Sequence, residues 1–450
     1  MGATEEFSRF LAQITTATIP EAAFAAARRL LLDGIGVAFA GSLERASGIL
    51  GDHVRSLGGE KHATALNFGF ETSTVSAAYL NGATMHVLDY EPMWNPPSHA
   101  LSTTLPAALA LGESLRASGK EILAALIKGV EAHGRLRVAS RQYEPRELVF
   151  HPPGVAGPIG GAVAAAHLLD LDVTELRNAM GIAASRAGSL LANVGTMTKC
   201  THCGNAAAAG LEAAQLASRG LSANPDVIEA PNGLAAAFFD ANWEAKALTI
   251  VGAPLRIIEP GFAIKMFPSQ FATHFVILAA LDARSRLPSP DDIAAVEIAG
   301  PIMPYVDRPR PLTGLDAKFS FQYTAASALV DGAVGVSTFT DGNCARADID
   351  AMLKKVRFAQ LPEIPATLDR MWIEVKITLD NGQVVTGKCV RPPGLWGTPI
   401  SEERHLAKVR DCFRMVLGES DTEELIDTLQ QFDTLSGSEV RGLMHTLGRF

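Results

Sequence analysis

The sequence has few cysteines, few aromatic residues and no excess of positive charge. Its 450 residues include five cysteines, and aromatic side chains make up 6% of the chain. A sparse and odd number of cysteines does not fit a disulfide framework and favours a reducing compartment. The 48 acidic residues outnumber the 39 basic ones, and no Lys/Arg cluster offers the charge that a phosphate backbone needs. We therefore expect a cytoplasmic protein without a nucleic-acid partner.

A secretory leader and long apolar runs are also missing. The first ten residues, MGATEEFSRF, carry two glutamates and lack the basic and apolar regions of a signal peptide. The apolar stretch at 154–169 is rich in glycine, alanine and proline and is shorter than a membrane span. Hydrophobic residues make up 48% of the chain, which is enough for a large core. The sequence predicts a folded protein of at least two units and no membrane partner.

Helical patterns fill the chain up to about residue 263. Thr18 and Glu21 predict a capping box, followed by an amphipathic helix that ends at Gly41. Asp172 and Glu175 repeat the capping signature before a second helix. We expect the first 263 residues to be all-helical.

Beyond Pro268 the spacing of apolar residues changes. Apolar residues alternate with polar ones over 373–379, and Asp380-Asn381-Gly382 is followed by a second extended run, which predicts a β-hairpin. Residues 294–299 predict another strand, and 318–330 have a helical composition. From residue 401 the helical pattern returns, and the expected N-caps are Ser401, Asp421 and Ser438.

The predicted fold class is mainly α with an α+β part. Both chain ends, residues 1–263 and 402–450, are expected to form one large helical domain. Residues 264–401 are expected to form a smaller α+β domain inserted before the last helices.

Four stretches concentrate groups that titrate or bind anions: residues 85–91 with 98–99, 150–154, 198–205 and 265–274. Five of the eleven histidines lie in them. Each of these histidines taken singly is more often exposed or bonded to the backbone than catalytic. The stretches therefore gain weight only in combination.

Lys199 is the most suggestive charged residue. No other formal charge occurs between Ala187 and Leu211, and a lone cation in apolar surroundings either reaches water or meets an anion. A helix expected to begin near Gly204 would add backbone N–H groups that favour a carboxylate or phosphate. This pattern predicts a small anionic substrate.

Metal and nucleotide motifs have weaker support. The segment Cys200-Thr201-His202-Cys203 lacks the second ligand pair of a structural zinc site, so we expect no metal and treat the cysteines as packing residues. The glycine-rich stretch at 154–161 does not have the dinucleotide-binding spacing and is better explained as a closely packed helix start. Of the carboxylates, Asp89 is favoured over Glu91 for orienting a histidine.

Taken together, these stretches resemble the MmgE/PrpD family, which includes 2-methylcitrate dehydratases, cis-aconitate decarboxylases and an iminodisuccinate epimerase. The matching segments are 81–90 (NGATMHVLDY), His99 with 105–109 (LPAAL), 151–157 (HPPGVAG), 198–199 with 204–207 (GNAA), 265–268 (KMFP) with His274, and 318–323 (KFSFQY). They follow the family's order along nearly the whole chain.

The resemblance implies a helical domain built from both chain ends, an α+β lid domain, a site between the two, and a homodimer. It implies a small di- or tricarboxylate substrate and no cofactor. Six residues match the family's site positions: Asp89, His99, His151, Lys199, His274 and Tyr323. Substrate binding is expected from Lys199 and His151, which would stabilise enolate charge, and from His86.

The expected chemistry is proton transfer at a carbon next to a carboxylate. His99, oriented by Asp89, is the leading acid or base, and Tyr323 and His274 could act from the opposite face. The family's Asp-Asp-Thr continuation is replaced by Glu91-Pro92-Met93, which argues against a substrate with an extra hydroxyl.

That replacement makes epimerisation of a dicarboxylate such as iminodisuccinate the leading hypothesis. A lyase of the 2-methylcitrate dehydratase or cis-aconitate decarboxylase type is the alternative. A carboxylate-binding protein without catalysis is a remote third possibility.

Overall fold

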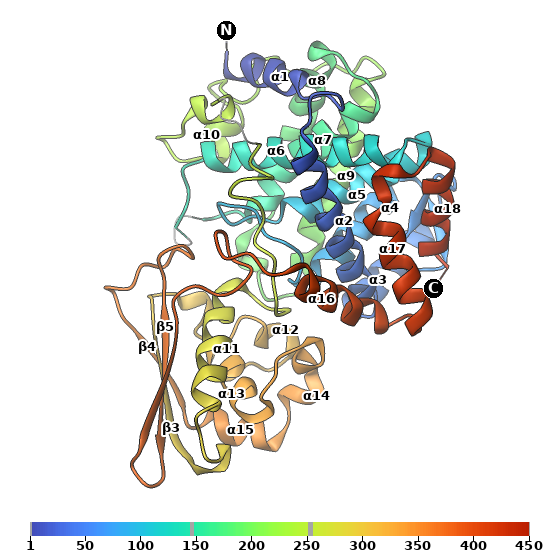
Figure 1. Cartoon of the computed structure of the whole chain (residues 1–450). Coiled ribbons are helices and arrows are strands. Elements are labelled where there is room, and N and C mark those ends of the chain that lie inside the picture. Colours follow the sequence, from blue (N-terminus) through green and yellow to red (C-terminus); the bar gives the residue numbers. More distant parts are fainter. Residues whose placement is uncertain (1, 145–147, 251–254, 450) are drawn as a thin grey trace.

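The structure is a computed structural model, and it describes residues 2–144, 148–250 and 255–449. A large helical part and a smaller part with a sheet lie side by side (Figure 1). This arrangement confirms the predicted fold class, mainly helical with an α+β part. The helices of the first 250 residues are α1 (Ala3–Gln13), α2 (Glu21–Ser42), α3 (Arg45–Leu57), α4 (Thr74–His86), α5 (Ala100–Leu115), α6 (Gly119–Ala139), α7 (Pro152–Leu168), α8 (Val173–Ala184), α9 (Thr198–Ala217) and α10 (Leu234–Phe238).

Two sequence predictions for this part need correction. A short hairpin of β1 (Ala63–Ala65) and β2 (Phe70–Thr72) interrupts the helices; three-residue strands are too short to produce a period of their own. The N-cap of α2 is Pro20, without a side-chain cap, because the Thr18 hydroxyl is used within its own turn, where it accepts from the Thr15 N–H at 2.9 Å. The capping box of Asp172 and Glu175 at α8 is confirmed.

Close packing of α9 depends on glycine. A Cβ on Gly204 would lie 2.3 Å from the Tyr79 carbonyl oxygen of α4, so only glycine allows the two helices this approach. Gly204 therefore lies inside α9, which begins at Thr198. The helix start expected near Gly204 was wrong by about a turn and a half, and Lys199 lies in the first turn.

The smaller part is built on a four-stranded mixed sheet in the order β4-β3-β5-β6. Its strands are β3 (Ile293–Gly300), β4 (Val356–Gln360), β5 (Ile373–Leu379) and β6 (Val384–Cys389). β3 pairs in parallel with β4, and the other pairs are antiparallel. The predicted hairpin is thus confirmed as β5–β6, with Gly382 at φ 83° in its turn.

Helices cover one face of this sheet (Figure 1). The helices of the smaller part are α11 (Phe271–Arg284), α12 (Gly314–Ala317), α13 (Phe321–Asp331), α14 (Asp341–Cys344) and α15 (Ala347–Leu353). α11 packs on β5 and β6, and α13 packs on β4. Apolar side chains of β5 alternate toward this layer, as the period of two predicts.

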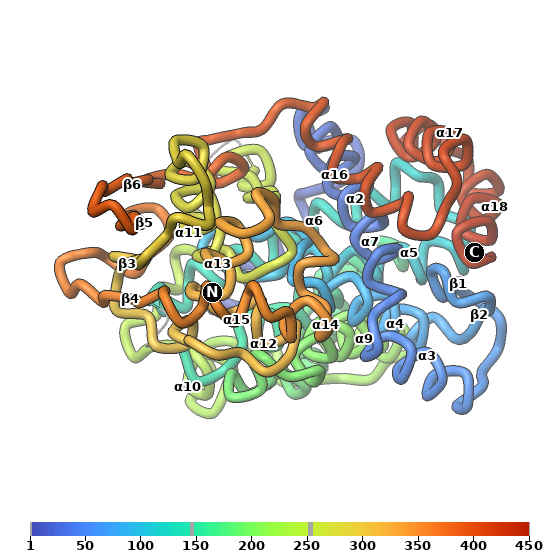
Figure 2. The backbone as a smooth tube through the Cα atoms, turned by 90° about the horizontal axis from the view of Figure 1, so that it is seen from below, coloured from blue at the N-terminus to red at the C-terminus, as the bar shows by residue number. Residues whose placement is uncertain are grey.

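The chain then returns to the helical part through α16 (Glu402–Arg414), α17 (Glu419–Gln430) and α18 (Gly437–Leu447). α16 and α17 pack against α2, and Figure 2 shows them beside the N-terminal helices. Ser401 caps α16 as predicted. The predicted caps Asp421 and Ser438 were wrong, because the N-cap residues are Gly418 and Ser436.

Each part of the molecule has its own large apolar cluster. The larger unites side chains from Phe7 to Ile264 with others from Ile400 to Leu447. The smaller runs from Ala263 to Trp396 and includes Met93. The division into domains 1–263 plus 402–450 and 264–401 stays a prediction. Among the described residues, no helix is both long and apolar enough to span a membrane.

Candidate active site

The predicted site residues lie mainly at helix ends. His86 is the last residue of α4, and His99 and His151 are the N-cap residues of α5 and α7. Lys199 lies in the first turn of α9. The positive ends of three helices therefore carry site residues, and a helix N-terminus favours a negative ligand.

Asp89 lies in the loop between α4 and α5 and is held by two ammonium groups. Lys199 Nζ lies 3.1 Å from Asp89 Oδ2. Lys265 Nζ binds Oδ1 of the same carboxylate. Burial opposes ionisation, but the charges of Lys199 and Lys265 keep the pKa of Asp89 well below its usual range. One carboxylate thus serves two buried cations, which leaves capacity for a further anion.

Glu91 organises two histidines of the site. Its Oε1 lies 2.5 Å from His86 Nδ1 and 2.9 Å from His99 Nδ1, and Ser102 Oγ donates to it at 3.0 Å. Burial alone would raise the pKa of Glu91, yet the contacts with His86 and His99 hold it well below its usual range. A carboxylate at both Nδ1 atoms favours the Nδ1–H tautomers and leaves each Nε2 as the reactive atom.

Glu91, rather than Asp89, is the nearer partner of His99. The distance from His99 Nε2 to Asp89 Oδ1 is 3.7 Å, against 2.9 Å between His99 Nδ1 and Glu91. Glu91 is thus the nearer carboxylate, and the orienting role expected of Asp89 stays a prediction. Spacing along the chain favoured Asp89, but Asp89 adopts a left-handed conformation with φ 52° and its carboxylate is occupied by the lysines.

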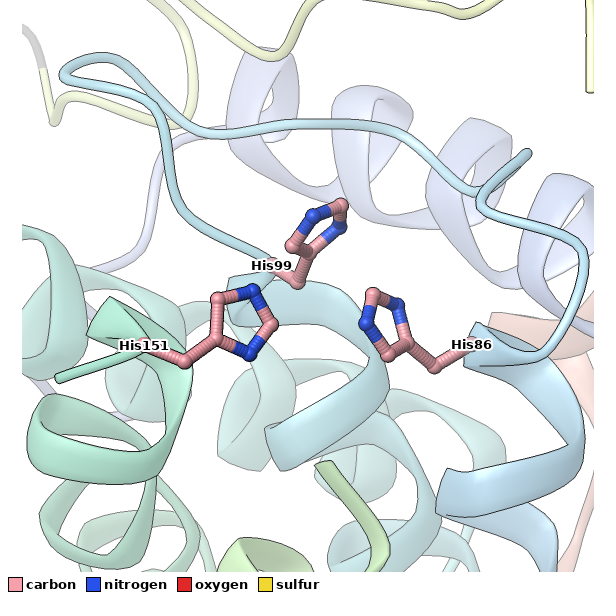
Figure 3. A group of neighbouring side chains, drawn as sticks. All are labelled: His86, His99 and His151. Atoms are coloured by element: carbon pink, nitrogen blue, oxygen red, sulfur yellow. The ribbon is translucent and has the colours of Figure 1, made fainter. Parts of the chain in front are cut away.

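His151 completes a group of three imidazoles with His86 and His99 (Figure 3). The ring centres of His86 and His99 are 4.3 Å apart, and His151 is 5.7 Å from each. His151 Nδ1 also lies 3.1 Å from His202 Nδ1. Burial and the nearby Lys199 charge lower the pKa of His86 to about 3 and hold that of His151 well below its usual value. Both imidazoles are therefore neutral at pH 7.

The smaller part of the molecule closes the site from the other side. Lys265 precedes α11, and His274 lies in that helix, stacked on Phe271 with ring centres 4.5 Å apart. Burial, followed by the charge of Lys265, lowers the pKa of His274 to about 3. Lys318 Nζ reaches the Leu88 carbonyl oxygen at 3.3 Å, and burial lowers the pKa of Lys318 to about 8.

Tyr323 is not brought to this cluster. Its hydroxyl donates to the Thr338 carbonyl oxygen at 2.6 Å, and its ring packs in an apolar cluster with Phe339 and Ile349. The catalytic role expected for Tyr323 is therefore not supported by its position. The Tyr305 hydroxyl accepts from Gln270 Nε2 at 3.0 Å, and burial, followed by the Asp89 charge, raises the pKa of Tyr305.

The Met93 side chain also has a different environment from the one that the sequence suggested. Its side chain is buried in the apolar cluster of the smaller part, and its backbone pairs with Ala263. The argument from Met93 against a substrate with an extra hydroxyl was based on neighbourhood in sequence, and the structure gives the side chain a packing role. Met93 is therefore weak evidence for choosing between the candidate substrates.

Lys265 and Lys318 were not singled out for the site. Lys265 carries the same signal as Lys199, because no Asp, Glu, Lys or Arg other than Lys265 occurs from 260 to 281. Lys318 gives no such signal, since Asp316 is two residues away. Lys318 reaches the site only because the smaller part packs against the loop after α4.

The imidazole group is also the set of residues that could hold a metal ion. One ligand atom from each of His86, His99 and His151 lies within 4.8 Å of the others. The ammonium groups on Asp89 oppose a divalent cation at this position and favour an anion. Within the described chain, His86 Nε2 and Glu91 Oε2 are buried without a hydrogen-bond partner. Buried polar atoms of this kind are expected to meet a ligand or water.

Comparison with known proteins agrees with this geometry. Residues 5–246 match the MmgE/PrpD N-terminal domain and residues 267–434 the MmgE/PrpD C-terminal domain. Cis-aconitate decarboxylases of Mus musculus and Homo sapiens are 31% and 30% identical, over 97% of this chain and 92% and 93% of their own lengths. One from Aspergillus terreus is 26% identical over 97% of this chain and 94% of its own. The chain therefore belongs to the MmgE/PrpD family and is one of its enzymes.

Proposed function

We propose that this enzyme is a lyase that removes a carboxyl group from a small unsaturated tricarboxylate of the cis-aconitate class. One observation carries the proposal: two ammonium groups and the imidazoles of His86 and His99 lie around a single buried carboxylate, Asp89. The cis-aconitate decarboxylases that resemble this chain over nearly its whole length support the choice of reaction. The remote hypothesis of a non-catalytic binding protein is dropped.

The reaction needs a carbanion next to a carboxylate. The bond between the methylene carbon and the departing carboxyl group breaks. Its electron pair forms a new double bond between that methylene carbon and the central carbon. The electrons of the old double bond move to the carbon next to a remaining carboxylate, and that carbon takes up one proton. One proton is consumed and one CO2 is released.

The lysines would stabilise the charge that develops. A carbanion next to a carboxylate places negative charge on the carboxylate oxygens, and each well-placed donor in such a site contributes about 3 kcal/mol. We assign this role to Lys199 with His151, as the sequence suggested. Lys265 holds Asp89 in place, which keeps Lys199 oriented.

The proton would come from His99. Glu91 holds Nδ1 of this imidazole, so Nε2 is free to carry a proton to the substrate carbon and to be reprotonated afterwards. His86 shares the same carboxylate oxygen, and its Nε2, which carries no proton in this tautomer, would bind the substrate as a hydrogen-bond acceptor.

Epimerisation of a dicarboxylate such as iminodisuccinate is the second candidate. Acid–base groups reach the site from both parts of the molecule, His99 from the helical part and His274 from the smaller one. Epimerisation requires such groups on two faces of a carbon, with no group leaving.

Proton NMR in deuterated buffer would test these alternatives. Chelator-treated protein is given cis-aconitate, 2-methylcitrate or iminodisuccinate in parallel, with Lys199→Met as the matched inactive control. We expect cis-aconitate to lose a carboxyl group and gain one deuteron on carbon. Interconversion of iminodisuccinate stereoisomers without decarboxylation would refute the decarboxylase assignment, and so would dehydration of 2-methylcitrate alone. The homodimer and the cytoplasmic location stay predictions.

A further inference from the structure

Three consecutive carbonyl oxygens of the loop after α4 are each bound by a different buried lysine. The oxygens of residues 88, 89 and 90 accept from Lys318, Lys265 and Lys408 at 3.3, 2.7 and 2.9 Å. The three lysines are almost completely buried. Lys318 and Lys265 come from the smaller part of the molecule, whereas Lys408 belongs to α16 near the end of the chain.

Lys408 has a fixed position of its own. Its Nζ binds both carboxylate oxygens of Asp33 in α2, at 2.8 and 2.9 Å. His405 Nε2 lies 3.0 Å from the same carboxylate. The Lys408 ammonium also lies 4.2 Å from the centre of the Tyr90 ring. Lys408 thus connects the rigid α2–α16 pair to the backbone of Tyr90.

Tyr90 separates the two carboxylates of the site. Asp89 holds Lys199 and Lys265, and Glu91 holds His86 and His99. A movement of the Tyr90 carbonyl would turn the peptide groups on either side and shift both carboxylates together. Displacement of catalytic groups by 1 Å is enough to cost about 100-fold in rate.

We propose that Lys408, without being part of the catalytic machinery, is a positioning residue that fixes Asp89 and Glu91 through the Tyr90 carbonyl. The inference rests on the proposed function, because it takes these two carboxylates as parts of the active site. It implies that α16, one of the C-terminal helices, helps to hold the active site in place.

The test removes the Lys408 ammonium without leaving an unpaired buried charge. Lys408→Met alone would leave Asp33 buried with one partner fewer, and breaking a buried pair in this way is strongly destabilising. The double variant Asp33→Asn with Lys408→Met removes both charges and keeps an acceptor for His405. Arg414→Met, an exposed position of the same helix, is the matched control.

Two readouts are compared in folded protein. In the double variant we expect kcat to fall about 100-fold while KM changes little, and Arg414→Met to match the wild type. We also expect amide hydrogen exchange of residues 87–91 to become faster in the double variant without substrate. Wild-type kcat together with unchanged exchange would overturn the proposal.

The two proposals fail in different ways. If the wild type turns over none of the three test substrates, the proposed function fails, and the exchange measurement alone then decides whether Lys408 holds the loop. If the wild type is active and the double variant is as active with the same KM, Lys408 is not a positioning residue.

Discussion

Lys265 binds Asp89 at two points, the carboxylate and the backbone carbonyl oxygen, the latter at 2.7 Å. Asp89 itself adopts a left-handed backbone conformation with φ 52°, and its carbonyl oxygen and its carboxylate meet the same ammonium group. The residue that anchors two lysines of the site is thereby fixed from the smaller part of the molecule. The way in which the two parts pack against each other therefore affects the geometry of the site.

Lys199→Met should lower kcat/KM by about 100- to 1000-fold, the usual cost of removing one donor to developing negative charge. The thioether keeps the volume and removes only the ammonium group. Steady-state turnover of the substrate identified by NMR measures the effect, with the exposed Lys246→Met as control. Unchanged turnover would remove Lys199 from the site.

Glu91→Gln should lower kcat by about 100- to 10,000-fold, the range of general acid–base contributions. The amide removes the negative charge that both Nδ1 atoms face, so the Nδ1–H tautomers of His86 and His99 would be less strongly favoured. Ser102→Ala, which removes the 3.0 Å hydrogen bond to the same carboxylate oxygen and a 3.3 Å contact with the His99 carbonyl oxygen but leaves the carboxylate in place, should have a much smaller effect. Equal losses in both variants would contradict the assignment.

The free energy of unfolding should decrease as the pH falls from about 6.5 to about 3. Burial lowers the pKa of His86, His133 and His274 to about 3 in the folded protein, whereas histidine in an unfolded chain takes up its proton near pH 6.5. The unfolded state thus binds more protons in this window, and each histidine costs on the order of 1 kcal/mol per pH unit.

Thermal or denaturant unfolding at several pH values measures this slope. His133 lies beside the site, with Nε2 2.7 Å from Ser98 Oγ. His133→Gln should reduce the slope of the unfolding free energy against pH by the contribution of one histidine. The exposed His53→Gln should leave the slope unchanged. A pH-independent stability in this window would contradict the burial of these neutral imidazoles.

Gly204→Ala should destabilise the protein by about 1–3 kcal/mol, the typical cost of overpacking a core. The new methyl group would lie 2.3 Å from the Tyr79 carbonyl oxygen and force α4 and α9 apart. Gly442→Ala is the matched control, because this helical position has open space around a Cβ. There alanine should stabilise the helix by about 0.5–1 kcal/mol. Chemical denaturation of both variants gives the comparison.

The site could be predicted in part. A lone cation in apolar surroundings must meet an anion, which identified Lys199 and would have identified Lys265. His99 and His151 were identified by their positions in the family's motifs, and both prove to be N-cap residues of helices. Tyr323 was carried over by position in a motif, and its hydroxyl proved to be bound to Thr338.

The sequence by itself determined the helical and strand periods, the β5–β6 hairpin and the return of a helical pattern after residue 401. These features follow from local patterns and turn chemistry. Only the tertiary structure decided that Glu91 rather than Asp89 holds His99, that Met93 packs in the core, and that Lys318 and Lys408 reach the loop at 88–90. These contacts join residues more than 200 positions apart or depend on side-chain direction in one loop, and no local pattern encodes either.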